Sequence, residues 1–118
     1  TIMESIAACD LPMSAAACQR VRDILTLYKD GPIRTPVPDE IPIAFKPGGI
    51  TGVSTVWGLV DIPDRPYVIV VMSNYGGNGG AVVEQVSRLA YDYFSRLSGI
   101  TEYGTRVPLD VKEAARNP

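Results

Sequence analysis

The sequence contains no histidine among its 118 residues. Catalytic triads with an imidazole base, metal sites with imidazole ligands and histidine-based pH switches are therefore excluded within this chain. Two cysteines, Cys9 and Cys18, are too few for a disulfide scaffold or a closed zinc site. We predict that both are free and buried. A disulfide between them stays open as an alternative, because it requires α-carbons within about 7 Å.

The sequence also lacks a large excess of either positive or negative side chains. The chain has 11 basic and 13 acidic side chains, a formal net charge of -2, and this balance argues against a nucleic-acid partner. No apolar run approaches the roughly 20 residues that span a bilayer. The first residues have neither a basic segment nor an apolar one that would indicate a targeting signal. We therefore predict no nucleic acid, no membrane span and no visible leader.

The length and the 46% hydrophobic content are those of one small globular domain. Apolar residues recur at helical spacing over residues 2–9, and again from the capping residue Ser14 until Asp30-Gly31-Pro32. A third and longer amphipathic helix is predicted over residues 81–97. Four prolines between residues 31 and 42 indicate an extended surface connection.

The middle of the chain predicts three strands. A short apolar run over residues 41–45 leads into Lys46-Pro47-Gly48-Gly49, and two further runs cover residues 55–62 and 67–72. Gly58 inside the second run indicates a bulge or a close approach. The third run is continuously apolar, so we predict that it is buried on both faces and has a partner on each side. The fold class is α+β, an incomplete antiparallel sheet flanked by helices.

Lys46-Pro47-Gly48-Gly49 is the segment whose residue types could bind or stabilise a reacting group. A lysine at the end of a strand, followed by glycines, presents an ammonium group and free backbone N–H groups. Lys46 would hold an anion, and the Gly49 N–H would stabilise a developing oxyanion. The alternative is a β-bulge with a solvated lysine.

The segment from Lys46 to Val60, KPGGITGVSTVWGLV, resembles the third active-site motif of class A serine β-lactamases and their penicillin-binding relatives. That motif is Lys-Thr/Ser-Gly, a short loop and a second strand. Residues 14–25, 67–74 and 81–97 resemble the family's surrounding helix, strand and C-terminal helix in the same order. The resemblance implies that residues 1–99 form the C-terminal part of such a catalytic domain and that residues 100–118 are a polar tail.

The resemblance also implies a function, the acyl transfer by which a serine attacks a β-lactam or peptide-like substrate. Lys46 would bind the substrate carboxylate and Gly49 would be an oxyanion donor, and these two are the catalytic residues. The substrate-binding residues would be Lys46, Pro47, Gly48, Gly49, Ile50 and Ser54. Two of them depart from the family pattern, since Pro47 lacks the hydroxyl of Thr or Ser, and Ser54 stands where many relatives have Arg. No cofactor and no metal are expected.

The nucleophile is missing from these 118 residues. The sequence contains no Ser-x-x-Lys and no Ser-Asp-Asn, motifs that lie upstream in the family. We therefore expect this chain to be inactive alone and to associate with the missing N-terminal half or with itself, through an open edge at residues 67–72. A non-catalytic scaffold and a penicillin-binding D,D-peptidase fragment are the alternatives. The family implies a periplasmic or secreted location.

Overall fold

The structure, a computed structural model, describes residues 2–27, 30–74 and 77–100. Its elements in chain order are α1 (Ile2–Ala8), α2 (Ala15–Thr26), β1 (Ile43–Ile50), β2 (Val53–Val60), β3 (Tyr67–Asn74) and α3 (Gly79–Leu97). All six expected elements are present. The proposed polar tail, apart from residue 100, lies outside the described residues.

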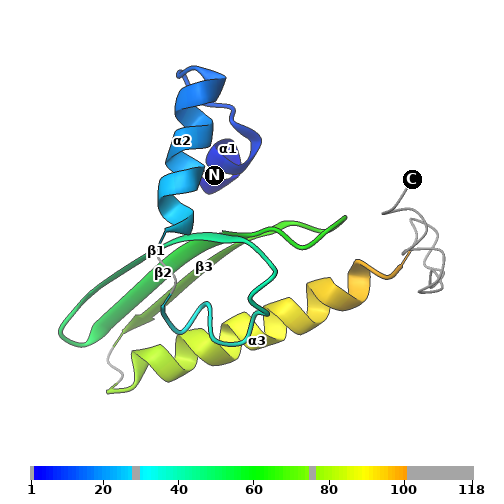
Figure 1. The fold of residues 1–118 in the computed structure, drawn as a ribbon. Helices are drawn as coiled ribbons and strands as arrows, with labels where there is room; N and C mark the ends of the chain where they lie inside the picture. The colour runs from blue at the N-terminus through cyan, green and yellow to red at the C-terminus, as the bar shows by residue number, and fades with distance from the viewer. Residues whose placement is uncertain (1, 28–29, 75–76, 101–118) are drawn as a thin grey trace.

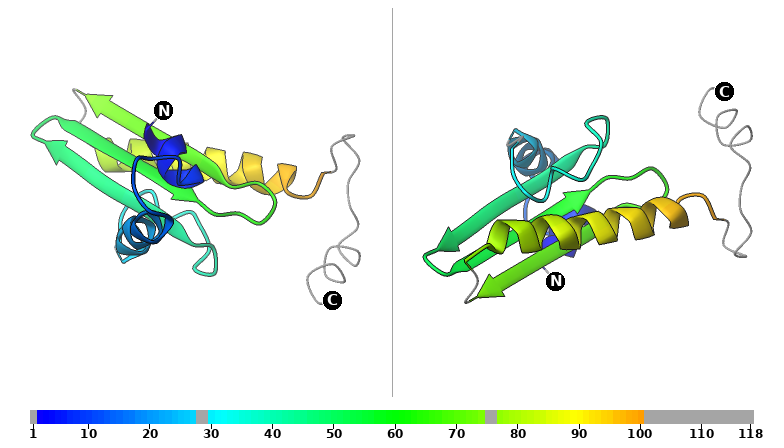
Figure 2. Two further views of the ribbon diagram at one scale, coloured as in Figure 1. Left: turned by 90° about the horizontal axis from the view of Figure 1, so that it is seen from above. Right: turned by 90° about the horizontal axis from the view of Figure 1, so that it is seen from below.

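The three strands form one antiparallel sheet in the order β1-β2-β3. Figure 1 shows α1 and α2 on one face of the sheet and α3 along the other, and the views from above and below in Figure 2 agree. The predicted class, an antiparallel sheet flanked by helices, is therefore confirmed. Both registers run without interruption, from Ile43 opposite Val60 to Ile50 opposite Val53, and from Val53 opposite Asn74 to Val60 opposite Tyr67.

The main hydrophobic core lies between the sheet and α3. Alternate residues of each strand face this side, and the helix contributes the buried Val83. Gly58 lies in this core, and the register of the strands passes through it without a bulge. A Cβ at Gly58 would lie 3.0 Å from both Ile33 Cδ1 and Phe45 Cβ. Of the two expectations for this glycine, the structure supports the close approach.

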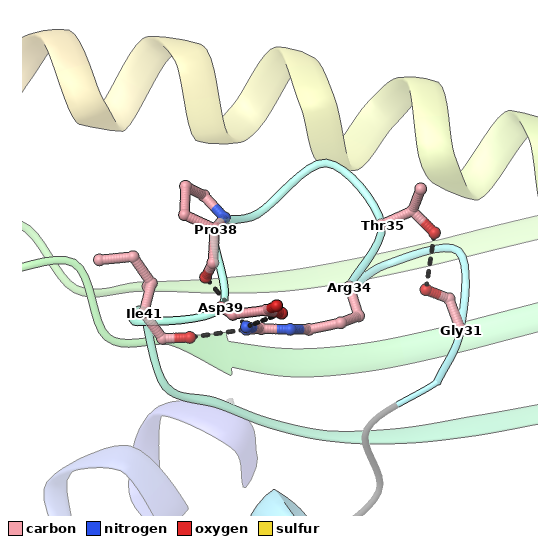
Figure 3. A network of polar contacts seen from close by, with 6 residues as sticks. All are labelled: Gly31, Arg34, Thr35, Pro38, Asp39 and Ile41. Carbon is pink, nitrogen blue, oxygen red and sulfur yellow. Dashed lines mark hydrogen bonds and ion pairs between the residues drawn. The ribbon is translucent and has the colours of Figure 1, made fainter.

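The proline-rich connection before β1 is not the surface segment that we predicted. Ile33 and Val37 belong to the core, because this segment turns back over β1 and β2 alongside α3 and fills the space there. Ser87 of α3 donates a buried hydrogen bond of 2.7 Å to the Ile33 carbonyl. Figure 3 shows how Arg34 holds the turn, donating to the Ile41 carbonyl at 2.6 Å and the Pro38 carbonyl at 2.9 Å.

The prediction that residues 67–72 are buried on both faces is also wrong for this chain. Among the described residues β3 pairs only with β2, and its buried residues Tyr67, Ile69 and Val71 alternate with less buried neighbours. Val70 is 58% exposed and Met72 is 78% exposed. The reason is that α1 contacts only part of this face, and no other described element covers the apolar side chains beyond it.

The two cysteines form a disulfide, which corrects the prediction of free thiols. Cys9 directly follows α1 and Cys18 lies in the first turn of α2. The chain reverses between the helices and brings the two α-carbons to 5.7 Å. This distance meets the geometric condition for the bond, which a nine-residue separation in sequence could not establish.

Candidate functional site

The hydrogen-bond pattern of β1 decides which of its backbone groups are available to a ligand. Asp61 N–H donates to the Pro42 carbonyl at 3.0 Å, so Pro42 and Asp61 form a hydrogen-bonded pair. In an antiparallel ladder such pairs alternate with non-bonded ones. Lys46 and Gly48 therefore bond to β2, while Pro47 and Gly49 direct their backbone nitrogen and carbonyl away from it.

β1 is an edge strand of the sheet, so the Gly49 N–H is directed outward, away from β2 and past the edge of the sheet. Pro47 fits the same pattern, because a proline is tolerated in a sheet where its nitrogen would face outward. An outward backbone N–H at the end of a strand is the arrangement that an oxyanion donor needs. The sequence suggested this role for Gly49, and the ladder supplies the orientation.

Lys46 lies on the sheet face that carries α2, and its side chain is exposed. Its Nζ donates to the neighbouring Pro47 carbonyl at 2.6 Å, which turns the ammonium toward the edge of the sheet. Beside it is an open, largely apolar hollow of about 390 Å³ between the end of α2 and β1, lined by Ile24, Leu25, Leu27, Phe45, Lys46 and Pro47. A cation thus stands beside an apolar recess.

A side chain at either glycine of the motif would meet β2, at a rotatable side chain for Gly48 and at the backbone for Gly49. A Cβ at Gly48 would lie 2.8 Å from Thr55 Oγ1, and a Cβ at Gly49 would lie 2.9 Å from the Val53 carbonyl oxygen. Thr55 is opposite Gly48 in the register, on the face that carries Lys46. The sequence reasoning did not single out Thr55. Strand alternation could have placed the Thr55 side chain on one face of the sheet, but only the register shows that Thr55 lies opposite Gly48.

The remaining predicted residues lie around this edge. Ile50 ends β1 and is exposed, on the same face as Lys46. Ser54 lies opposite Gly49 in the register, but its side chain is directed to the α3 face, where a Cβ at Gly79 would overlap the Ser54 hydroxyl. The structure therefore brings Lys46, Pro47, Gly48, Gly49 and Ile50 together along one strand, with Ser54 behind it at the start of α3.

Two further structural findings concern cations and membranes. Among the residues that the structure describes, no group of three or more His, Cys, Asp or Glu side chains could hold a metal ion. Within the same part of the chain, no helix is both long enough and apolar enough to cross a bilayer.

Comparison with known families settles the relationship. The β-lactamase enzyme family matches residues 1–94. The chain belongs to this family. No curated protein matches it. The assignment confirms the resemblance seen in the motif that begins at Lys46.

Solved structures agree with the fold of this β-lactamase-family chain. The ancestral class A β-lactamase GNCA is 27% identical, with a TM-score of 0.62 over 70% of this chain and 35% of that one. PBP-A is 24% identical, with a TM-score of 0.68 over 80% of this chain and 37% of that one. A β-lactamase from Sphaerobacter thermophilus DSM 20745 is 20% identical, with a TM-score of 0.69 and corresponding coverages of 80% and 38%. This chain spans less than two fifths of each structure.

Proposed function

We propose that this chain supplies the Lys-x-Gly strand and one oxyanion donor to a serine β-lactamase-like hydrolase. The observation that carries the proposal is the outward Gly49 N–H beside Lys46, in a chain that belongs to the β-lactamase enzyme family. The nucleophile has to come from polypeptide outside these 118 residues, since they contain no Ser-x-x-Lys. The chain by itself is then inactive.

The proposed chemistry assigns one role to each group. When a serine oxygen attacks the substrate carbonyl, the carbonyl oxygen gains negative charge and the Gly49 N–H donates to it. A single donor of this kind contributes about 2.7 to 4 kcal/mol to the transition state. Lys46 attracts the substrate carboxylate. Pro47 offers no hydroxyl to that carboxylate, so affinity for ordinary β-lactams is expected to be low.

The disulfide supports the proposed location. Disulfides between cysteines persist in the periplasm and outside the cell and are rare in the reducing cytosol. The bond between Cys9 and Cys18 therefore favours the periplasmic or secreted site that the family resemblance implied.

A second candidate function is a non-catalytic binding or scaffold domain. Pro47 favours it, because the substitution removes a substrate-binding hydroxyl while leaving the strand intact. A D,D-peptidase is the remaining alternative within the same chemistry. The two hydrolases differ in how fast water releases the acyl group from the serine.

The experiment begins with native mass spectrometry of freshly purified protein, to identify a polypeptide with Ser-x-x-Lys joined to or held by this segment. That species is then incubated with a fluorescent penicillin. We expect a labelled serine, and at least a hundredfold slower labelling in the Lys46→Met variant than in a Lys46→Arg variant that keeps the charge.

Each outcome separates the candidates. Release of the label within seconds supports a β-lactamase, and a label that persists for minutes identifies a D,D-peptidase. A complete, folded assembly that neither takes the label at saturating penicillin nor hydrolyses the penicillin would overturn the hydrolase proposal and leave the scaffold function. Equal labelling of the Lys46 variants would contradict the role given to Lys46.

A further inference from the structure

The layer formed by α1 and α2 is separate from the main hydrophobic core. Among the described residues, the core cluster takes its members from the three strands, α3, the segment before β1 and Ile62, and none from α1 or α2. The two helices lie on the opposite face of the sheet, α1 against β2 and β3 and α2 against β1. Because the two layers share no core side chain, one can open while the other keeps its packing.

Packing by itself holds the α1–α2 layer weakly. α1 has 7 residues and α2 has 12, and isolated helices of these lengths are marginal in water. Each helix has a single buried residue, Met3 in α1 and Cys18 in α2. Ile24 of α2 is 59% exposed. One of the two buried side chains that hold the layer in place is therefore half of the disulfide.

Cys9 has a backbone conformation that the crosslink helps to maintain. Its φ of 53° lies in the left-handed region, where a residue with a Cβ is less stable than glycine. Cys9 N–H donates to the Ile6 carbonyl at 3.3 Å, and Asp10 N–H donates to the Ser5 carbonyl at 2.8 Å. These two bonds end a helix in the way that usually places glycine at this position. Breaking the S–S bond therefore releases the end of α1 from a disfavoured conformation.

We propose that the Cys9–Cys18 disulfide is a redox-sensitive switch, with α1 and α2 held on the sheet when the bond is formed and released when it is reduced. Ile24 and Leu25 of α2 line the hollow beside Lys46, so reduction removes a wall of the candidate site. The complete site would then form only in an oxidising compartment. This effect on the site rests on the proposed function, whereas the opening of the layer does not.

The two sulfurs differ in access, which sets the order of the exchange. Cys18 is 1% exposed, and Cys9 is only partly buried. One thiolate of a dithiol reductant attacks Cys9 Sγ, and the S–S electron pair leaves with Cys18 Sγ, in the first turn of α2, where a helix favours a thiolate. The second thiolate of the reductant then closes its own disulfide and expels Cys9 Sγ. The two cysteine sulfurs take up the two protons that the dithiol loses.

The test uses the assembly isolated for the labelling experiment, first oxidised and then reduced with dithiothreitol. Alkylation and mass spectrometry verify the state of Cys9 and Cys18. Amide exchange is followed in α1 and α2 and, for comparison, in β2 and α3, and labelling by the fluorescent penicillin is timed in both states.

A matched pair of double variants separates the crosslink from other effects of the reductant. Cys9→Gly with Cys18→Ala and Cys9→Ala with Cys18→Ala both lack the disulfide. They differ only in whether residue 9 accepts a positive φ. Dithiothreitol should have no further effect on either variant.

We expect reduction to speed amide exchange in α1 and α2 at least tenfold and to change it less than threefold in β2 and α3. Labelling should slow at least tenfold, and reoxidation should restore both properties. The Cys9→Ala double variant should behave as the reduced protein, and α1 should exchange at least threefold more slowly in the Cys9→Gly double variant.

Unchanged protection of α1 and α2 after verified reduction would overturn the switch, and so would an equal loss of protection in every element, which is global unfolding. Labelling at an unchanged rate while the layer opens would overturn the effect on the site and leave the hydrolase proposal intact. An assembly that opens on reduction, but neither takes the label nor hydrolyses penicillin when oxidised, would contradict the proposed function and support the opening of the layer.

Discussion

Tyr67 combines tight packing with an unsatisfied polar group. Its ring stacks on Phe94 with 4.4 Å between ring centres and 9° between ring planes. Its hydroxyl is buried and has no hydrogen-bond partner among the described residues. Burial, with a smaller contribution from nearby Tyr91, raises the pKa of Tyr67 to about 12. The residue therefore favours the folded state only while its hydroxyl stays protonated.

This raised pKa predicts a loss of stability in alkali. In the unfolded chain the tyrosine has its ordinary pKa of 10.0, so the free energy of unfolding begins to fall once the pH exceeds that value. The contribution, about 2 to 3 kcal/mol, is complete below pH 10 and is lost as the pH rises through about 12. Tyr67→Phe should remove this dependence and be at least as stable at pH 7, because it deletes an unpartnered hydroxyl.

Urea unfolding at pH 7, 9 and 11 measures the effect. Tyr93→Phe is the matched control, since Tyr93 lies on α3 and is exposed. An equal alkaline loss of stability in the wild type and in Tyr67→Phe would contradict the prediction.

At the scale of the element, β1 directs the backbone N–H groups of two neighbouring glycines to opposite sides of the strand. Gly48 bonds to β2, whereas Gly49 directs its N–H outward. The same alternation holds in β3, where Val71 faces β2 and Met72 faces outward. Whether this chain has an oxyanion donor thus depends on the phase of a ladder and not on a side chain.

Hydrogen exchange of the free chain tests this phase. The Gly48 and Val71 amides should exchange at least tenfold more slowly than those of Gly49 and Met72, because only the first two are hydrogen-bonded. Exchange is followed residue by residue by NMR at one pH. Protection of Gly49 equal to that of Gly48 would mean that its N–H is not available to an oxyanion.

At the scale of the whole molecule, the two layers on the sheet are held in different ways. α3 is fixed by the main core and by Ser87. On the opposite face, α1 and α2 bury few side chains, chiefly Met3 and Cys18, and the disulfide joins the two helices. The covalent bond thus compensates for limited packing in this layer.

Removing the disulfide should therefore lower the stability of the folded chain. A Cys9→Ser, Cys18→Ser double variant should lose about 2 to 3 kcal/mol of unfolding free energy, as expected for a loop of this size. Chemical denaturation measures the loss, and the wild type with a reductant serves as the comparison. A double variant as stable as the oxidised wild type would show that the α1–α2 layer needs no crosslink.

Most of the fold could be predicted from the sequence because it rests on local patterns. Helical spacing located all three helices, and the apolar runs located β2, β3 and the beginning of β1, which continues through the motif to Ile50. The motif beginning at Lys46 identified the family. The glycines of that motif also indicated a place where a ligand approaches the backbone. These features are encoded within a few residues of one another, so no distant contact is needed to read them.

Distant contacts decided the rest. The burial of Ile33 depends on how the chain turns back over β1 and β2, and the disulfide depends on a chain reversal that sets 5.7 Å between two α-carbons. The sequence by itself determined that Gly49 could be an oxyanion donor. Only the tertiary structure decided that its N–H points outward, because the direction of a backbone group in a sheet is set by the register with the partner strand.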